Sequence, residues 1–416
     1  MPTPRLELAT GLALLRDGSF ARLWGARFIS AFGTSMAPIA LAFALLDLTG
    51  RAEAIGQVLA CQIGAQVATL LFGGTLADRF DRRRMMVWAD GLAALSQGAS
   101  AGLILSGDVA IWQLMVLQAV TGVAFAFHGP AAVGLIPQLV PRDKLQPANA
   151  LLSLSQSGAL SLGAAGAGIL VALLGAGYAL AVDAGTFALS AALIAGTRPR
   201  AQQRGAAATL WRELRDGWRE FTSHRWLWTI VLQFSVLVAA WEGGFGVVGP
   251  TVAQRALGGA TDWGWIASAF GVGTLVGGLV GIRLHVVRQI RFATFAILTH
   301  ALPLLLLIGP APVAVVALGA FCAGIGGSLF GLFWFTTLHT QVAPEALSRV
   351  SAYDHLGSMA LAPLGVIAAG YAVERLGAPT TLWIAAAGIV LPTLAVLAVP
   401  EVRQLRGKVD LDERAE

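Results

Sequence analysis

The sequence predicts an all-α integral membrane protein whose twelve spanning helices form two pseudo-symmetric six-helix bundles. Only 12% of its 416 residues are charged, whereas 56% are hydrophobic, and the mean hydropathy is +0.72. A soluble chain of this length cannot cover its surface with so little charge. Glycine occurs 50 times, and small residues let membrane helices approach one another closely.

Twelve apolar stretches follow one another, each close to the roughly 20 residues that cross about 30 Å of hydrocarbon. They cover residues 24–47, 54–76, 85–106, 110–135, 150–174 and 177–196, then 226–250, 263–282, 290–308, 311–337, 350–373 and 380–399. If the N-terminus is cytoplasmic, only Arg51, Arg255 and Arg375 of the 28 basic residues fall on the outer side. This asymmetry predicts that both termini are cytoplasmic.

The chain repeats short patterns at a spacing of roughly 200 residues, as parallel transporter repeats do. Three matches occur in the same order in both halves: Leu15–Gly18 with Leu214–Gly217, Gly73-Gly74 with Gly277-Gly278, and Gln138-x-x-Pro141 with Gln341-x-x-Pro344. They predict an N-terminal bundle (1–196), a cytoplasmic linker (197–225), and a C-terminal bundle with a cytoplasmic tail (226–416). Apolar residues at helical spacing in the linker predict an amphipathic helix, which lies on the membrane or packs on the end of a bundle.

A short basic turn joins the second and third stretches. Between residues 78 and 84, in the sequence Asp-Arg-Phe-Asp-Arg-Arg-Arg, all positions except Phe80 are charged. So basic a turn should face the cytoplasm. The pattern Gly74-x-x-x-Asp78-Arg79-x-x-Arg82-Arg83 resembles the loop between helices two and three of the major facilitator superfamily. Its form here resembles the drug and siderophore (macrolide and enterobactin) exporter branch of that family.

A second resemblance covers the passage from the fourth to the fifth stretch. It is carried by Pro130-Ala131, by the run Leu135–Pro141 and by Ala148-Asn149-Ala150. Two positions depart from the pattern, because Thr34 and Gln118 stand where many relatives carry aspartate and arginine.

The resemblance implies a transporter that works by alternating access, with a charged clasp at the basic turn. Asp78 would face the N-terminus of the eleventh helix, placed near Ser351, where the helix dipole favours a negative charge. Arg82 would pair with a nearby acid, for which Asp143 is the candidate. The expected gating residues are Gly74, Asp78, Arg79, Arg82, Arg83, Asp143 and Asp354. The alternative is that these charges only set the topology.

Ionisable residues inside spanning stretches are costly and therefore become candidate sites. Glu242 comes first, because it lies well inside the seventh stretch beside a glycine-rich run and has no basic neighbour in sequence. It is a candidate proton carrier or cation-binding group. The other candidates for proton or substrate binding are Asp90, Asp183, His128, Trp241, Phe245 and Trp334. For each, the alternative is a side chain that only packs against or is satisfied by neighbouring helices.

Several activities are not expected. The sequence has no Walker A motif, no metal-spaced His/Cys cluster and no Gly-x-Ser-x-Gly elbow. We expect no enzyme, no cofactor and no nucleic-acid partner, with a proton gradient as the energy source. The expected function is proton-coupled export of an amphipathic drug, macrolide or siderophore by a monomer in the bacterial cytoplasmic membrane. The alternatives are lipid or lysolipid flipping, a non-transporting receptor and an integral membrane enzyme.

Overall fold

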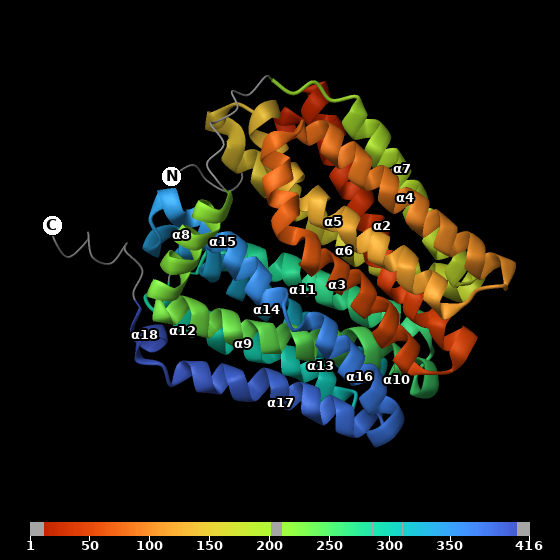
Figure 1. Ribbon diagram of the computed structural model, residues 1–416. Coiled ribbons are helices and arrows are strands. Elements are labelled where there is room, and N and C mark those ends of the chain that lie inside the picture. Colours follow the sequence, from red (N-terminus) through yellow and green to blue (C-terminus); the bar gives the residue numbers. More distant parts are fainter. Residues whose placement is uncertain (1–11, 201–209, 285, 310, 406–416) are drawn as a thin grey trace. The chain divides into compact units, whose positions relative to one another are not determined.

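The computed structural model describes residues 12–200, 210–284, 286–309 and 311–405, which form helices joined by short turns (Figure 1). The first half contains α2 (Gly18–Thr49), α3 (Ala52–Arg79), α4 (Arg82–Ser106), α5 (Ile111–Leu139), η1 (Arg142–Lys144), α6 (Leu145–Leu174) and α7 (Ala176–Ala195). The second contains α8 (Leu210–Ser223), α9 (Arg225–Trp241), η2 (Glu242–Val248), α10 (Gly249–Ala256), α11 (Ala260–Gly281), α12 (Gln289–Ala296), η3 (Ile297–His300), α13 (Ala301–Leu306), α14 (Val313–Gln341), α15 (Pro344–Met359), α16 (Ala362–Leu376), α17 (Ala378–Leu397) and α18 (Pro400–Gln404).

All twelve predicted stretches are helical. Among the described residues, ten helices are long and apolar enough to cross a membrane. Helix α4 is not among the ten, because a polar stripe that includes Asp90 and Gln97 interrupts its apolar residues. The all-helical membrane fold is therefore confirmed, and α4 shows why hydropathy understates a span that buries polar groups.

The chain divides into two compact units. One comprises Met1–Gly50, Gln57–Ala206 and Gly258–Ser268, and the other comprises Arg51–Gly56, Ala207–Leu257 and Ala269–Glu416. Two short segments thus group away from their own half, namely the start of α3 and the start of α11. We retain the boundaries at residues 196 and 226 as a proposal for where the bundles end and begin.

Local sequence explains where the first helices start and stop. Asp17 caps α2, since its side chain accepts hydrogen bonds from the backbone of Ser19 at 2.8 Å and of Phe20 at 3.2 Å. Gly50 ends α2 with φ +68°, a left-handed conformation that favours glycine. Asp81 caps α4 in the same way by accepting from the Arg84 amide at 3.0 Å. One acid of the basic turn therefore starts a helix.

Small residues set the helix spacing in the first unit. A Cβ at Gly163 of α6 would lie 2.2 Å from the Phe32 carbonyl oxygen of α2, so these backbones touch. A Cβ at Gly122 of α5 would lie 2.0 Å from the Gln62 carbonyl oxygen of α3. Van der Waals packing at such close approaches stabilises helix pairs in a bilayer, where the hydrophobic effect cannot.

Two spans of the second unit depart from regular α-helix. The seventh predicted stretch passes from α9 into a π-helix, η2, and then into α10, whereas the ninth passes from α12 through a 3₁₀ segment, η3, into α13. Three glycines lower the helix propensity of η2. The π-helix also packs closely on α16, because a Cβ at Gly243 would meet the Gly365 carbonyl oxygen at 2.8 Å.

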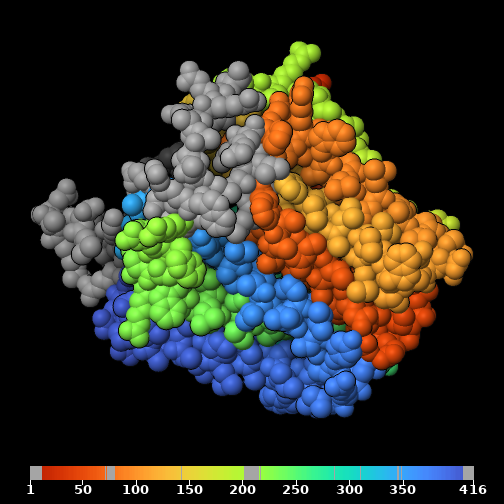
Figure 2. All heavy atoms as spheres, viewed as in Figure 1, coloured from red at the N-terminus to blue at the C-terminus, as the bar shows by residue number. Residues whose placement is uncertain are grey.

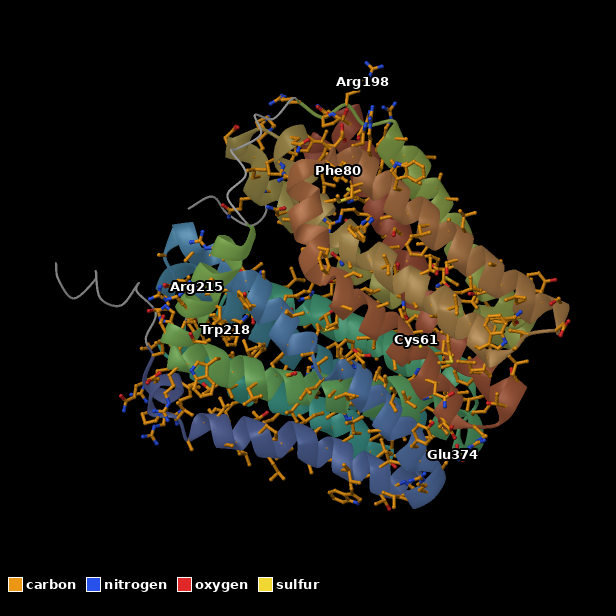
Figure 3. All side chains as sticks on the ribbon, viewed as in Figure 1. Cys61, Phe80, Arg198, Arg215, Trp218 and Glu374 are labelled. Carbon is orange, nitrogen blue, oxygen red and sulfur yellow. The ribbon has the colours of Figure 1, made fainter. Side chains whose placement is uncertain are left out.

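The linker helix α8 packs on α15. Its Trp218 ring lies 5.5 Å from the Tyr353 ring, and Phe221 lies 6.0 Å from the same ring. Figure 2 shows the green atoms of α8 beside blue atoms of α15, and Figure 3 labels Trp218 and Arg215 on this helix. Of the two arrangements that the sequence allows, this contact is packing on the end of a bundle. Helix α15 begins at Pro344, before the predicted Ser351, because proline suits a first helical turn.

Candidate functional site

Glu242 begins the π-helix of the second unit. The Gly249 amide donates to the Gly244 carbonyl, an i to i−5 bond that defines the wide turn. Such turns are rare and often occur at functional sites, because the extra residue redirects the side chains around it. The sequence analysis identified Glu242 and the glycine run, but it did not predict this winding.

Aromatic rings surround the start of the π-helix. Trp241 stacks on Phe245 with ring centroids 4.4 Å apart and planes 8° apart. Trp241 also lies 5.2 Å from Phe270 of α11 and 4.6 Å from His300 of η3. These four residues, Trp241, Phe245, Phe270 and His300, form what we term the Trp241 cluster. The two irregular spans therefore meet through this cluster.

The Glu242 side chain is partly exposed beside this cluster. No described residue donates a hydrogen bond to its carboxylate or forms an ion pair with it. Its Oε2 atom lies 3.5 Å from the place that a Cβ on Gly246 would occupy, so the side chain lies along its own turn. A carboxylate in this position can bind a proton or a cation, and the neighbouring ring faces attract cations as well.

His300 and Phe270 are the members of the Trp241 cluster that were not predicted from the sequence, and His300 is the polar one of the two. Its side chain is buried, and its Nδ1 atom has no hydrogen-bond partner among the described residues. A Cβ at Gly327 of α14 would lie 2.9 Å from the His300 ring. In the sequence, His300 is a histidine within an apolar stretch. That feature alone does not distinguish a functional histidine from one that only packs against neighbouring helices.

Asp354 and Trp334, predicted separately, meet in the second unit. The Trp334 indole of α14 donates to the Asp354 carboxylate of α15 at 3.0 Å, and both side chains are buried. Trp334 also lies 6.1 Å from Phe330 and 5.7 Å from Trp226 in an aromatic column. The bond ties α14 to α15, and a gating role for Asp354 remains a prediction.

Asp90 and His128, also predicted separately, meet in the first unit. The Asp90 carboxylate of α4 lies 2.7 Å from Nδ1 of His128 on α5. Its other oxygen accepts from the Ser190 hydroxyl of α7 at 2.6 Å. Three helices therefore meet at this buried acid. The arrangement is consistent with a residue that holds the helices together and with one that binds a proton or the substrate.

Asp183 ends a second buried polar chain. It accepts from the Gln97 amide at 2.8 Å, and Gln97 in turn accepts from the Gln118 amide at 2.8 Å. The other Asp183 oxygen faces Gly33 of α2, where a Cβ would lie 2.5 Å away. Gln97 was not among the predicted site residues. Its position two turns after Asp90, on the same face of an apolar helix, could have indicated a polar contact inside the bundle.

Two arginines of the basic turn bind backbone carbonyls. Arg82 donates to Gly134 of α5 at 2.6 Å, and Arg83 donates to Thr197 after α7 at 3.1 Å. Asp143 is exposed in η1. Gly74, Asp78 and Arg79 lie in the last part of α3, for which the structure describes only the helical backbone. The clasp therefore remains a prediction.

Residues 23–353 match the family model described as Major Facilitator Superfamily. The chain belongs to this superfamily. It is therefore a multi-pass membrane protein and a secondary transporter, and its family consists of transporters and not of enzymes.

Two curated relatives of the transporter match over nearly its whole length. Macrolide efflux protein A of Streptococcus pyogenes is 23% identical, with 94% of this chain and 97% of that protein covered. The multidrug efflux pump Tap of Mycobacterium tuberculosis is 27% identical, with coverage of 91% and 93%. The lysophospholipid transporter LplT of Klebsiella pneumoniae is 33% identical over 151 residues, 35% of this chain and 34% of that protein.

Two solved structures share the transporter's fold. The nucleoside transporter NupG superposes with a TM-score of 0.73 at 14% identity, covering 93% of this chain and 99% of that one. A D-xylose-proton symporter gives a TM-score of 0.65 at 16% identity, with coverage of 92% and 98%. At these identities the likeness shows the fold alone.

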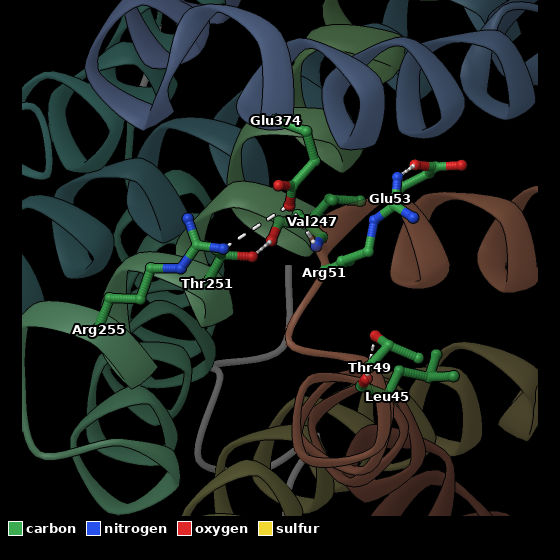
Figure 4. Close-up of polar contacts among 9 residues, drawn as sticks. Leu45, Thr49, Arg51, Glu53, Val247, Thr251, Arg255 and Glu374 are labelled. Atoms are coloured by element: carbon green, nitrogen blue, oxygen red, sulfur yellow. Dashed lines mark hydrogen bonds and ion pairs between the residues drawn. The ribbon is translucent and has the colours of Figure 1, made fainter.

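A further polar cluster of the transporter lies around Glu374, at the end of α16 (Figures 3 and 4). Its carboxylate accepts from the Ala52 amide, the first residue of α3, at 2.9 Å. Arg255 of α10 lies 3.6 Å from the same oxygen, and Arg51 pairs with Glu53 beside it. A carboxylate at a helix N-terminus is favourable, so Glu374 attaches the start of α3 to the second unit. The sequence analysis did not choose Glu374, because it lies in an outer loop region.

Proposed function

We propose that this transporter exports amphipathic small molecules, such as drugs, macrolides or siderophores, in exchange for protons. Macrolide efflux protein A and Tap support export, because each match covers more than nine tenths of both chains. We further propose that the protein is a monomer in the bacterial cytoplasmic membrane with both termini inside. The location of the basic residues supports this orientation.

The observation that carries the proposal is the Glu242 carboxylate beside the Trp241 cluster. When ionised, it attracts a cationic group, whose apolar part packs on Trp241 and Phe245. When protonated, it loses that attraction. A proton and a cationic cargo therefore compete for one carboxylate, which is the condition for exchanging one for the other. Alternating access between two halves then couples the two movements.

The available energy is sufficient for export. When one proton is exchanged for a cargo with one positive charge, no net charge crosses the membrane, so the pH gradient and not the membrane potential supplies the energy. A difference of one pH unit releases about 1.4 kcal/mol per proton, which supports a cargo gradient of roughly tenfold. One exchanged proton therefore suffices for a useful degree of export.

We propose that the basic turn closes the transporter on its cytoplasmic side. Asp78 would face the N-terminus of α15, where the helix dipole stabilises a carboxylate. The contacts of Arg82 and Arg83 with backbone carbonyls support a rigid turn, because they hold the start of α4 against α5 and the end of α7.

The test is uptake of a panel of cargos into inverted vesicles with an imposed pH gradient. Glu242→Gln should abolish the dependence of uptake on the gradient, because an amide cannot carry the proton. Glu401→Gln, an exposed acid of α18, is the matched control and should leave uptake unchanged. Unaltered gradient dependence in Glu242→Gln would mean that another group couples transport to protons.

The partial match to the lysophospholipid transporter LplT favours a second candidate, the flipping of lysolipids. Proteoliposomes with a fluorescent lysophospholipid in one leaflet test it directly. Gradient-independent movement of this lipid, together with no uptake of any drug in the panel, would favour flipping over export.

A further inference from the structure

The first unit contains a cavity that neither the sequence analysis nor the proposed function uses. It has a volume of about 310 Å³ and lies between α2, α5 and α6. Apolar side chains, including Val133, Pro137 and Leu145, form one part of its wall. Arg27, together with polar residues of α6, forms the other part. The cavity is therefore amphipathic, with its positive charge on one side.

The polar residues of α6 form one stripe. Asn149, Ser153 and Gln156 follow at intervals of four and three residues, which places them on the same face of the helix. All three side chains are exposed. Since polar side chains are costly toward lipid, a stripe of this kind indicates a face that meets water or a polar ligand.

Arg27 lies well inside α2. At 1.5 Å per residue, it is about 14 Å along the helix from Gly18. Its Nη2 atom donates to the Gln156 amide oxygen at 3.4 Å, a long and weak hydrogen bond. No carboxylate of the described residues forms an ion pair with it. The structure places this arginine in the cavity wall.

The helix that carries Arg27 is held firmly on both sides of it. The Trp24 indole donates to the Ser155 hydroxyl of α6 at 2.6 Å. Trp24 also stacks on Phe28 with ring centroids 5.8 Å apart. The Trp24 bond and the close approach of Gly163 to the Phe32 carbonyl hold α2 against α6 on both sides of Arg27, so the backbone that carries the guanidinium is fixed before any ligand arrives. Such preorganisation lowers the entropic cost of binding.

We propose that this cavity binds a carboxylate group of the transported molecule, with Arg27 as the residue that recognises it. The planar guanidinium matches a carboxylate through two parallel hydrogen bonds. The amide nitrogen of Asn149 supplies a further donor, and the apolar wall receives the adjoining part of the ligand. The proposal rests on the proposed export function and narrows the cargo to amphipathic molecules that carry a carboxylate in addition to the cationic group that Glu242 attracts.

Binding of matched probes to the purified full-length protein tests this. The probes are 1-naphthylacetate and its methyl ester, which differ in charge but hardly in shape, and calorimetric titration measures both. The wild type should bind the acid about tenfold more tightly than the ester, as expected for a charge-assisted pair. Arg27→Gln should lower this preference to about twofold or less, while Arg27→Lys, which keeps the charge, should retain part of it.

The controls separate this proposal from a folding defect and from the proposed function. Arg403→Gln, an exposed arginine of α18, should leave the preference unchanged. Glu242→Gln should abolish gradient-driven transport without altering the preference, so either proposal can fail alone. Equal affinity for acid and ester, no binding of either, or an undiminished preference in Arg27→Gln would each overturn the assignment.

Discussion

Neutralising Glu374 should loosen the first turn of α3. The carboxylate accepts from the Ala52 amide at 2.9 Å and lies 3.6 Å from the Arg255 guanidinium. Glu374→Gln keeps an acceptor for the amide but removes the charge. The lost interaction with the helix dipole is about 0.3–1 kcal/mol. The ion pair adds little, because 49% of the Arg255 side chain and 28% of the Glu374 side chain are exposed.

A total of about 1 kcal/mol corresponds to roughly fivefold more frequent opening of this turn. Glu374→Ala also removes the acceptor, so its effect should be larger, about 2 kcal/mol or roughly thirtyfold. Hydrogen–deuterium exchange of peptides that cover residues 50–56 measures both effects. Exchange elsewhere in the protein should stay unchanged, which distinguishes local loosening from general destabilisation.

Glu401→Gln is again the matched control, since this acid is exposed and starts a different helix. If exchange at residues 50–56 were the same in the wild type, Glu374→Gln and Glu374→Ala, the carboxylate would not stabilise the start of α3. If Glu374→Gln alone had no effect, the hydrogen bond and not the charge would hold the turn.

Three further changes test other parts of the molecule. Gly33→Ala should destabilise the fold by about 1–3 kcal/mol and so lower its melting temperature, because the new Cβ would lie 2.5 Å from Asp183. The control Gly91→Ala, which has no atom within 4 Å of the new Cβ, should leave the melting temperature unchanged. Equal effects of the two substitutions would contradict the packing argument. Gln97→Leu should destabilise the fold by about 1–3 kcal/mol in the same melting experiment, since it leaves Asp183 without its amide donor, and unchanged melting would mean that water replaces the amide. Asp78→Asn should strongly reduce uptake into vesicles at a normal level of inserted protein, and normal uptake would remove the clasp.

The transmembrane fold follows from local properties of the sequence. Hydrocarbon admits only segments that satisfy their backbone hydrogen bonds internally, so length and apolar composition predict the spans. Charged turns predict orientation for the same reason, since arginine is costly to bury. The stretches at 24–47 and 311–337 therefore correspond to α2 and α14. Asp81 is also explained locally, because its side chain caps the first turn of α4.

Tertiary packing decided which polar residues meet. Asp90 and His128 come together only because α4 packs on α5, and no spacing along the chain brings them to one helix face. The glycines at 243, 244 and 246 indicate a weak helix, but only the structure shows the π-turn that presents Glu242, at the place where Gly243 packs closely on α16. Hydropathy records the cost of leaving water for each residue separately. The sites depend instead on distances between helices, which only the folded chain contains.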